Sequence, residues 1–384
     1  MSRLFGLCVL FCLSGLTAMA ATTVMLNGKP VVVPVIEANG KAFVDIAALM
    51  KLLGGSAAFD ADAHKLMIST TGSTPATTAT SSGTPELAGD NGVPGKIYTL
   101  RKSDPLYFCL LGAEYTTSQL IIGESLYVPA AEEKLLVLHF TVQNPQKAEM
   151  LARSDSLRFT AVDAMNVNHE SIENWGDAQS HKPVDLMLKP AQKIEAYTAI
   201  IVPAKGIVPK LMVQSNRDDD GPVLRYDLHG KVTALAAPIA DPADQTGATA
   251  LTEVPAKMNT AYPYQKFDIT VEKFTYTTDK LDADAPEEGG RFLVVTLLIK
   301  NKAPTPSLLR NDQITPTLTS TDGEDLKYTS SLLFATTARS IDQDLKVGQE
   351  MRARIYFTVP KGTAGKTFTL KEGNSRAYLF EVKE

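Results

Sequence analysis

One segment of this sequence occurs twice. LKPAQKIEAYTAIIVPAKG, residues 188–206, returns as LKVGQEMRARIYFTVPKGT at residues 345–363, a constant offset of 157. Distant positions keep the same offset, because Asn144 aligns with Asn301 and Arg153 with Arg310. A repeat of this length indicates one domain-sized unit built twice, so it constrains architecture before chemistry. The repeated motif favours a turn that enters a long strand; a shared binding motif is the alternative.

The repeated units have the periodicity of β-strands. KLLVLHFTVQN (134–144) and RFLVVTLLIKN (291–301) are strand-length runs of β-forming residues that end at an asparagine. The later segments alternate and then reach Pro203 and Pro360, which cannot continue a central strand. Short strands with little helical periodicity predict a mainly β protein with two tandem immunoglobulin-like β-sandwiches. Neither unit has the Cys…Trp…Cys pin of antibody domains, so we expect aliphatic and aromatic cores.

Composition divides the rest of the chain. We expect a signal peptide at 1–20, a small α+β module at 21–70, a Thr/Ser/Gly/Pro linker at 71–95, the first sandwich at 96–232, an Ala/Pro/Thr linker at 233–259, and the second sandwich at 260–384. The two linkers contain few large apolar residues. They cannot bury enough surface to order themselves, so we predict flexible connections.

The module at 21–70 combines hairpins with one helix. Asn27-Gly28 and Asn39-Gly40 each stand between alternating apolar residues, and such pairs suit type I′ turns. DIAALMKLLGG then predicts a helix that is capped by Asp45 and stopped by Gly54-Gly55. A last hairpin over AAFDADAHKLMIS completes the module.

This ordered pattern, LNGK, NGKAFVDIAALMKLLGG, AAFD and KLMIS, resembles the copper amine oxidase N-terminal-like, or stalk, domain of exported bacterial proteins. In that family the module is an appendage beside many kinds of partner domain. The resemblance does not imply copper, because the oxidase chemistry belongs to a separate catalytic domain with an Asn-Tyr pair. No Asn-Tyr pair occurs in this sequence.

The two repeated units resemble immunoprotective-type, immunoglobulin-like domains of bacterial secreted proteins. FLVVTLLIKN and LKVGQEMRARIYFTVP carry the resemblance in the second unit. The first unit departs from that pattern at Ala191, where the family has a glycine. The resemblance implies an extracellular location and no defined activity.

The first twenty residues have the pattern of a secretory signal. Arg3 supplies the positive start, LFGLCVLFCLSGL the apolar region, and Ala18-Met19-Ala20 the cleavage site. Cleavage near Ala20 would give a secreted, periplasmic or cell-envelope protein. The apolar run is too short to span a bilayer comfortably, and no later run reaches the necessary length, so we expect no stable membrane span after cleavage.

Charge and cysteine content exclude some classes of protein. Loss of Arg3 with the signal leaves 37 of the 38 basic residues against 43 acidic ones. This mild acidity argues against a nucleic-acid partner, which needs a basic patch. Two of the three cysteines leave with the signal, so the mature chain has Cys109 alone and no internal disulfide. An apolar setting favours a buried inert thiol over a reactive or cross-linking one.

No catalytic motif is present in the sequence. GESLY, residues 123–127, lacks the second glycine of a nucleophile elbow, and NHESIE lacks the second histidine of a zinc protease. His64, His139, His169 and His229 lie in strand or turn contexts that favour solvent or loop placement over metal ligation. We therefore predict a protein that is not an enzyme, with no catalytic, cofactor-binding or metal-binding residues and no cofactor.

One acidic loop comes close to a calcium-binding pattern. NRDDDGPVLRYD places Asn216, Asp218 and Asp220 at alternate positions before Gly221, with Asp227 at the twelfth place. The last residue is Asp rather than Glu, and KLMVQS and VLRYDL are typical of paired strands. A hairpin tip is the favoured interpretation and calcium binding the alternative. DADAPEEGG, residues 282–290, is similarly interpreted as a solvated loop.

Trp175, the only tryptophan, lies in the polar segment ENWGDAQSH. It either packs over the sandwich edge or stacks on a sugar from an exposed loop. Three functions remain open. The favoured one is a non-catalytic modular protein of the bacterial cell envelope or exterior, which contacts protein or polysaccharide through sandwich surfaces or edge strands. The alternatives are a glycan- or substrate-binding accessory protein and an enzyme with an unrecognised site.

Overall fold

The chain consists of two units, residues 1–84 and 85–384, and each is described by itself. The computed structural model describes the backbone of six short strands between residues 24 and 70. From residue 90 to the end it describes all residues except 102–103, 217–221, 282–283, 315, 327, 329–331, 338 and 384. The predicted signal peptide, the helix expected from Asp45 and most of the first linker lie outside the described residues.

The first unit contains three antiparallel hairpins. Their strands are β1 (Val24–Leu26) with β2 (Lys29–Val31), β3 (Val35–Ala38) with β4 (Lys41–Val44), and β5 (Gly55–Asp60) with β6 (Lys65–Thr70). Leu26 pairs with Lys29 and Ala38 with Lys41, so each loop has two residues. The two Asn-Gly pairs occupy these loops, which confirms the hairpins predicted from them.

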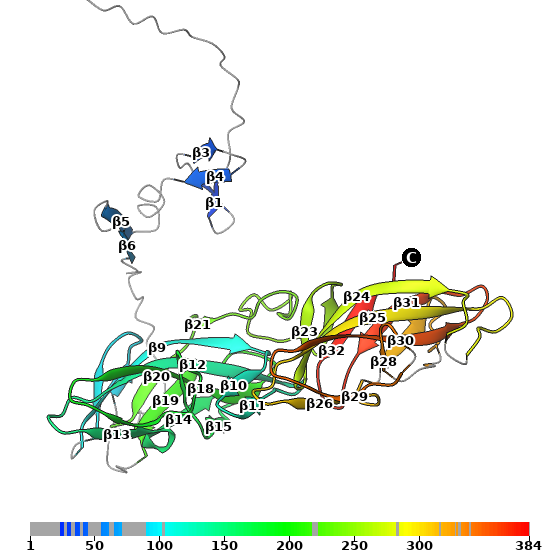
Figure 1. The fold of residues 1–384 in the computed structure, drawn as a ribbon. Helices are drawn as coiled ribbons and strands as arrows, with labels where there is room; N and C mark the ends of the chain where they lie inside the picture. Colours follow the sequence, from blue (N-terminus) through cyan, green and yellow to red (C-terminus); the bar gives the residue numbers. More distant parts are fainter. Residues whose placement is uncertain are drawn as a thin grey trace, which may run out of the picture. The chain divides into compact units, whose positions relative to one another are not determined.

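The second unit begins with a sandwich of two sheets (Figure 1). One sheet has the order β16-β18-β12-β9-β21, with β8 also on β9, and the other has the order β15-β14-β19-β20-β7. The strands are β7 (Asp90–Gly92), β8 (Tyr98–Leu100), β9 (Leu106–Thr116), β12 (Glu133–Gln143), β14 (Leu157–Val162), β15 (Asn168–Glu170), β16 (Gly176–Asp177), β18 (Lys193–Pro203), β19 (Lys210–Ser215), β20 (Leu224–Asp227) and β21 (Val232–Thr233). Two small pairs, β10 (Leu120–Ile122) with β11 (Ser125–Tyr127) and β13 (Met150–Arg153) with β17 (Asp185–Leu188), and the 3-10 turn η1 (Ser154–Ser156) lie between them.

A second sandwich follows with the same arrangement. Its sheets have the orders β23-β24-β25-β30-β28 and β22-β32-β31-β27, and β26 pairs with β29. The strands are β22 (Glu253–Ala256), β23 (Ala261–Tyr264), β24 (Phe267–Thr277), β25 (Arg291–Asn301), β26 (Ser307–Arg310), β27 (Thr317–Ser320), β28 (Leu333–Phe334), β29 (Asp342–Leu345), β30 (Glu350–Val359), β31 (Gly365–Leu370) and β32 (Ala377–Glu381). The prediction of a mainly β chain with two immunoglobulin-like sandwiches is confirmed.

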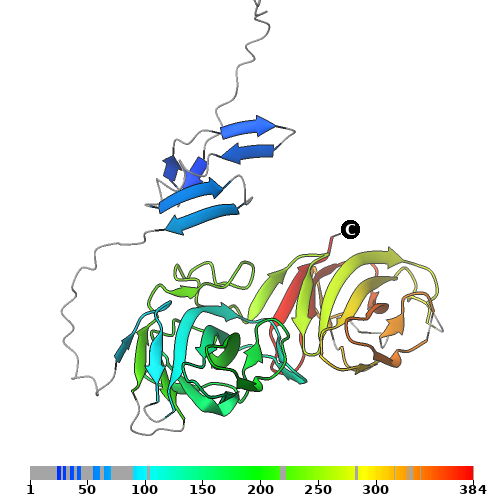
Figure 2. The same ribbon diagram turned by 60° about the vertical axis from the view of Figure 1, so that its left-hand side comes forward.

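The two sandwiches have separate cores, and Figure 2 shows them as two bodies. The unbroken apolar run of β12 is explained by burial on both faces. Leu136 and Leu138 enter the core between the sheets, whereas Leu135 and Val137 join a smaller cluster on the outer face beneath β10 and β11. A strand that is covered on both sides does not need polar alternation.

The repeated motif is a turn. In each copy the side-chain oxygen of the motif's glutamine, Gln192 or Gln349, accepts a hydrogen bond of 2.9 Å from the amide of the lysine three residues earlier. The residue before the glutamine is left-handed, with φ of 63° at Ala191 and 71° at Gly348. This explains the glycine of the second copy, since only glycine adopts this conformation without strain. The first copy keeps the turn with an alanine.

A buried asparagine closes each turn. Asn144 donates through Nδ2 to the carbonyls of Ala148 and Leu188, both at 2.8 Å, and its Oδ1 accepts from the amide of Gln146 at 2.8 Å. Asn301 makes the same three bonds to Thr305, Leu345 and Ala303, at 3.1, 2.9 and 2.9 Å. The terminal asparagine of both strand-length runs is therefore a structural clasp.

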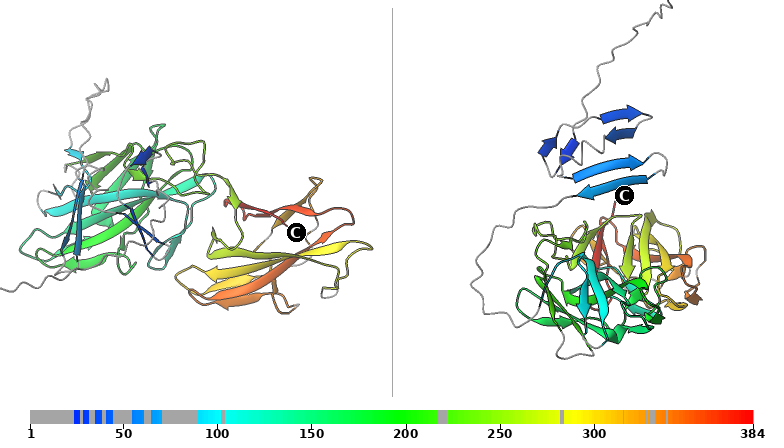
Figure 3. Two further views of the ribbon diagram at one scale, coloured as in Figure 1. Left: turned by 90° about the horizontal axis from the view of Figure 1, so that it is seen from above. Right: turned by 90° about the vertical axis from the view of Figure 1, so that its left-hand side faces the viewer.

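The two expected linkers are partly ordered. Residues 90–92 of the first form β7, which pairs in parallel with β20. Gly92 permits this pairing, because a Cβ there would lie 2.6 Å from the Tyr226 ring. The second, 233–259, differs from the flexible connection expected. It contributes β22, and it runs between the two sandwiches (Figure 3). Ala248 is buried in the first core and Val254 in the second, so the segment is packed at both ends.

Candidate functional site

The two sandwiches are joined by a buried arginine. Arg376 precedes β32 in the second sandwich and is 3% exposed. Its Nη2 donates to the carbonyls of Ala131 and Glu133 in the first sandwich, at 2.9 and 2.7 Å, and its Nε donates to the carbonyl of Leu251 at 2.7 Å. The amide of Ala131 also donates to the carbonyl of Asn374 at 2.8 Å. Three carbonyls thus accept from Nε and Nη2 of the guanidinium, so the contact between the sandwiches is made by main-chain acceptors.

A buried lysine holds the connecting segment to the first sandwich. Lys134, at the start of β12, is fully buried, and its ammonium donates to the carbonyls of Ala204, Gly206 and Ala248. The ammonium also lies 4.4 Å from the ring centroid of Tyr115. Burial lowers the pKa of Lys134 to about 8, because desolvation disfavours the charged form. The segment that connects the two sandwiches is therefore hydrogen-bonded to the first sandwich through Lys134.

A cleft of about 750 Å³ opens beside this joint. Its floor is the outer face of β9, β12 and β18, and its walls are the loop at 117–121, the turn at Ala178, the connecting segment at 234–239, and Lys302 of the second sandwich. Gln119, in the wall of the cleft, reaches from the first sandwich to the second. Its side-chain amide donates to the carbonyls of Gln265 and Phe267 at 2.7 and 2.9 Å. The cleft is therefore shaped by both sandwiches.

The polar groups of the cleft are paired in the floor. His139 Nε2 lies 3.1 Å from Glu114 Oε1, and the phenol of Tyr197 donates to the carbonyl of Ile121 at 2.6 Å. His181 Nδ1 lies 3.1 Å from the same phenol. Burial raises the pKa of Tyr197, so the phenol remains a neutral donor at physiological pH.

One polar atom of the cleft has no hydrogen-bond partner among the described residues. Thr117 is 4% exposed, and its Oγ1 is buried and unpaired. A buried hydroxyl without a partner is costly, and Thr117 therefore adds a locally unfavourable group to the cleft wall. The arrangement suits binding by shape, apolar contact and a few hydrogen bonds.

Each described histidine has a carboxylate or a phenol as its partner. His169 lies 2.9 Å from Asp163 and His229 2.5 Å from Asp227, in addition to the two in the cleft. His64 lies outside the described residues. Over the part of the chain that the structure describes, no three His, Cys, Asp or Glu side chains gather as metal ligands would.

Trp175 is in the core of the first sandwich. It is 1% exposed and meets Phe140 and Phe159 edge-on, at centroid distances of 5.2 and 6.0 Å. These phenylalanines belong to opposite sheets, so the indole fills the space between them. The sugar-stacking alternative for Trp175 is therefore wrong. A polar sequence context does not predict burial when the side chain turns inward.

The acidic loop lies on a hairpin, as predicted. β19 and β20 pair antiparallel on either side of it, and Asn216 Oδ1 accepts from Arg158 at 2.9 Å. Asp218 and Asp220 lie outside the described residues, so the calcium alternative stays a prediction. In the other acidic segment, Asp284 accepts from the phenol of Tyr356 at 2.9 Å. Cys109 is buried and forms no disulfide, and burial raises the pKa of its thiol.

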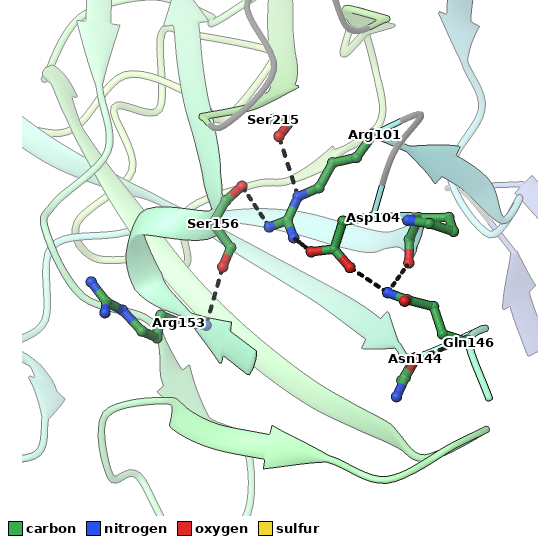
Figure 4. Close-up of polar contacts among 8 residues, drawn as sticks. Arg101, Asp104, Asn144, Gln146, Arg153, Ser156 and Ser215 are labelled. Carbon is green, nitrogen blue, oxygen red and sulfur yellow. Dashed lines mark hydrogen bonds and ion pairs between the residues drawn. The ribbon is translucent and has the colours of Figure 1, made fainter. Parts of the chain in front are cut away.

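A polar network closes one end of the first sandwich (Figure 4). Arg101, 3% exposed, donates to Asp104, to Ser215 and to the carbonyl of Ser156, at 3.2, 3.3 and 3.2 Å. Gln146 donates to Asp104 at 2.5 Å and connects this network with Asn144. These groups bond to one another and tie loops together, so the network is structural.

Sequence reasoning missed the cleft and the two buried cations. Lys134 and the carbonyl of Ala248 are 114 residues apart, and Arg376 and Ala131 are 245 apart. For Lys134, the sequence held one usable signal: a positively charged residue begins the apolar strand in both copies, Lys134 in the first and Arg291 in the second.

The chain is similar to known proteins over part of its length. Residues 256–377 match a family model described as Domain of unknown function (DUF4352), which falls on the second sandwich and covers less than half of the chain. The crystal structure of an uncharacterised β-sandwich protein from Clostridium difficile 630 is similar, with 17% sequence identity, 38% of this chain and 99% of that chain covered, and a TM-score of 0.29. No curated protein matches the chain significantly.

The chain is therefore a β-sandwich domain protein, and its architecture rests on the strand pairing described above. Within the part of the chain that the structure describes, no helix has the length and apolar character that a membrane crossing needs.

Proposed function

We propose that this is an exported, non-catalytic modular protein of the bacterial cell envelope or exterior, which contacts protein or polysaccharide through its tandem sandwiches. The signal pattern that ends at Ala20 supports export. The resemblances to a stalk module over 21–70 and to immunoprotective-type domains over 96–232 and 260–384 support an extracellular location. The buried position of Trp175 removes the aromatic platform that favoured a glycan-binding accessory protein.

One observation carries the proposal. Arg376 and Lys134 hold the two sandwiches and their connecting segment together, and the preformed cleft lies at that joint. A fixed joint lets a binding surface form across two domains without the entropy cost of ordering them on contact. The hydrogen-bonded His139 and Tyr197 in the floor of the cleft suit recognition, because their positions are fixed before a partner binds.

The test compares two neighbouring substitutions. Ala178 is exposed and lines the cleft, whereas Gln179 is exposed and does not line it. The mature chain from residue 21 is immobilised as wild type, Ala178→Arg and Gln179→Arg, and it is exposed to solubilised envelope protein and sheared envelope polysaccharide. An arginine at 178 would fill the cleft, so retention of the partner should fall about tenfold, whereas Gln179→Arg should retain it.

Two results would contradict the proposal. Equal retention by both variants would remove the cleft as the binding site, and turnover of any retained material would remove the non-catalytic role. Export is tested separately by N-terminal sequencing of the protein in the extracellular or periplasmic fraction. A mature N-terminus close to Ala21 is expected, and a cytoplasmic product that retains residues 1–20 would refute export.

A further inference from the structure

The long edge strands of the two sandwiches correspond residue by residue. In β9, Ala113 pairs with Leu138, and in β24, Phe274 pairs with Val295. Leu138 and Val295 are equivalent at the repeat offset of 157, so Phe274 is the counterpart of Ala113. By the same register Lys273–Thr277 of β24 is equivalent to 112–116 of β9.

In the first sandwich this edge is covered by the chain itself. β21 pairs in parallel with β9, with Val232 opposite Ala113 and Thr233 opposite Glu114. Val232 and Leu235 pack against the core. The covering segment follows the last strand of the sandwich, β20, after a short turn. It therefore completes the sheet and shields the core at once.

In the second sandwich the equivalent edge has no strand on it among the described residues. β23 pairs with Phe267–Thr270, and the amide of Asn259 donates to the carbonyl of Val271 at 2.9 Å. Beyond that point, β25 is the one described strand that pairs with Lys273–Thr277. Figure 1 shows β24 along the rim of its sandwich. Open strand edges are templates for pairing with another chain.

The side chains around this edge are also duplicated. The phenol of Tyr115 accepts from the amide of Val208 at 2.7 Å, and that of Tyr276 accepts from Gly365 at 2.9 Å. A cation lies over each ring, Lys134 over Tyr115 at 4.4 Å and Arg291 over Tyr276 at 3.7 Å.

The difference between the copies is the cover. Tyr115, next to Glu114 on the edge that β21 covers, is 7% exposed. Tyr276 and Arg291 are only partly buried. The second sandwich thus has the same tyrosine and cation without the segment that covers them in the first.

We propose that the outer edge of Lys273–Thr277, with the ring of Tyr276, is a docking site for an extended polypeptide segment of another molecule. The segment adds in parallel to β24 and carries an apolar side chain at the position of Val232 and another three residues later, as in the covered copy. Strand addition of this kind draws affinity from main-chain hydrogen bonds and specificity from the apolar side chains. The inference gives the proposed binding role a partner class, and its test does not involve the cleft.

The test uses the first copy's own segment as the probe. A synthetic peptide with the sequence of residues 229–236, HGKVTALA, is added to the full mature chain, and hydrogen–deuterium exchange is followed by mass spectrometry. Exchange over 273–277 should slow by about tenfold or more, because an amide that gains a sheet hydrogen bond exchanges only after opening. Exchange over 112–116, where the edge is already covered, should not change.

Two controls separate docking from adhesion. A scrambled peptide and a peptide with aspartate in place of Val232 should give no protection, because the position equivalent to Val232 faces the core. A second arrangement places the segment in the same chain by adding HGKVTALA after Val382, the counterpart of Leu228. This graft should protect 273–277 even if the free peptide binds weakly, because the two ends are then held close together.

The outcomes decide the proposal. Protection confined to 273–277, by the peptide or by the graft, supports it. Absence of protection in both arrangements, or protection only elsewhere on the chain, would overturn it. Loss of cleft binding by Ala178→Arg would leave this result unaffected, so the two proposals fail separately.

Discussion

Replacement of Asn144 by alanine should strongly destabilise the first sandwich. The side chain is fully buried and makes three hydrogen bonds of 2.8 Å, two as donor and one as acceptor. At about 1 kcal/mol for each hydrogen bond the loss is about 3 kcal/mol, and the carbonyls of Ala148 and Leu188 are left without this donor. The backbone amide of Gln146 also loses its acceptor, Asn144 Oδ1. Gln146 is then held less firmly, so its side-chain hydrogen bond to Asp104, shown in Figure 4, should weaken.

Trp175 makes the measurement specific to one sandwich. It is the only tryptophan of the chain and lies in the first core, so its fluorescence during urea unfolding reports that sandwich. Asn144→Asp is the first control, because it keeps the volume and the acceptor and loses both donors, so it should cost at least as much as the alanine. Asn301→Ala is the matched variant, with the same three bonds lost in the second sandwich. Asn301→Ala should lower the urea midpoint that far-UV circular dichroism reports. It should displace the tryptophan fluorescence transition less than Asn144→Ala does, because Trp175 lies in the first core.

The reasoning would be refuted by a small effect. A loss below about 1 kcal/mol for Asn144→Ala would mean that water or a local shift replaces the three bonds. A near-neutral Asn144→Asp would show that the donors contribute little.

Two further predictions concern the repeat turn and a buried cation. Ala191→Gly should stabilise the first sandwich by about 0.5 kcal/mol, because relief of left-handed strain exceeds the added entropy of the unfolded chain. Gly348→Ala should destabilise the second sandwich by a similar amount. A Cβ at 348 meets no neighbouring atom, so the strain of the left-handed backbone is the main effect. Calorimetry of both variants would contradict this reasoning if the two shifts in unfolding temperature had the same sign. Burial lowers the pKa of Lys134 in the folded chain to about 8, from an ordinary 10.5. Between pH 8 and 10.5 the unfolded chain therefore binds more protons than the folded chain, so the free energy of unfolding should rise with pH. Below pH 8 both states are protonated at Lys134, and its contribution should not change with pH. Thermal unfolding from pH 7 to 10 should show this rise in the wild type and not in Lys134→Met; a rise of equal size in both would sink the assignment.

Local patterns carried the prediction of the fold. The two Asn-Gly pairs predicted the hairpins of the first unit, and the apolar runs that end at Asn144 and Asn301 predicted the central strands. These features succeed because a turn or a strand face depends on neighbours within a few residues. The alanine in place of the family's glycine at 191 was likewise visible, and the structure supplies its consequence, a left-handed alanine.

Contacts between distant segments were beyond the same reasoning. The polar context of Trp175 left open whether the ring packs over the sandwich edge or is exposed, whereas two phenylalanines on opposite sheets enclose it in the core. The composition of residues 233–259 predicted a flexible linker, yet Ala248 and Ala250 are buried. The carbonyls of Ala248 and Leu251 in this segment accept hydrogen bonds from Lys134 and Arg376. A segment with few large apolar residues has no core of its own, but it becomes ordered when its carbonyls accept hydrogen bonds from buried cations.

The sequence by itself determined the repeated β architecture, because offset, alternation and turn residues are written along the chain. Only the tertiary structure decided which polar groups are buried, where the cleft opens, and which strand edge is left uncovered. The physical reason is that burial and pairing depend on segments up to 245 residues apart, and their meeting has no local signature. Two copies of one unit thus differ where one has the covering strand β21 and the other has an edge on β24 that no strand of the described residues covers.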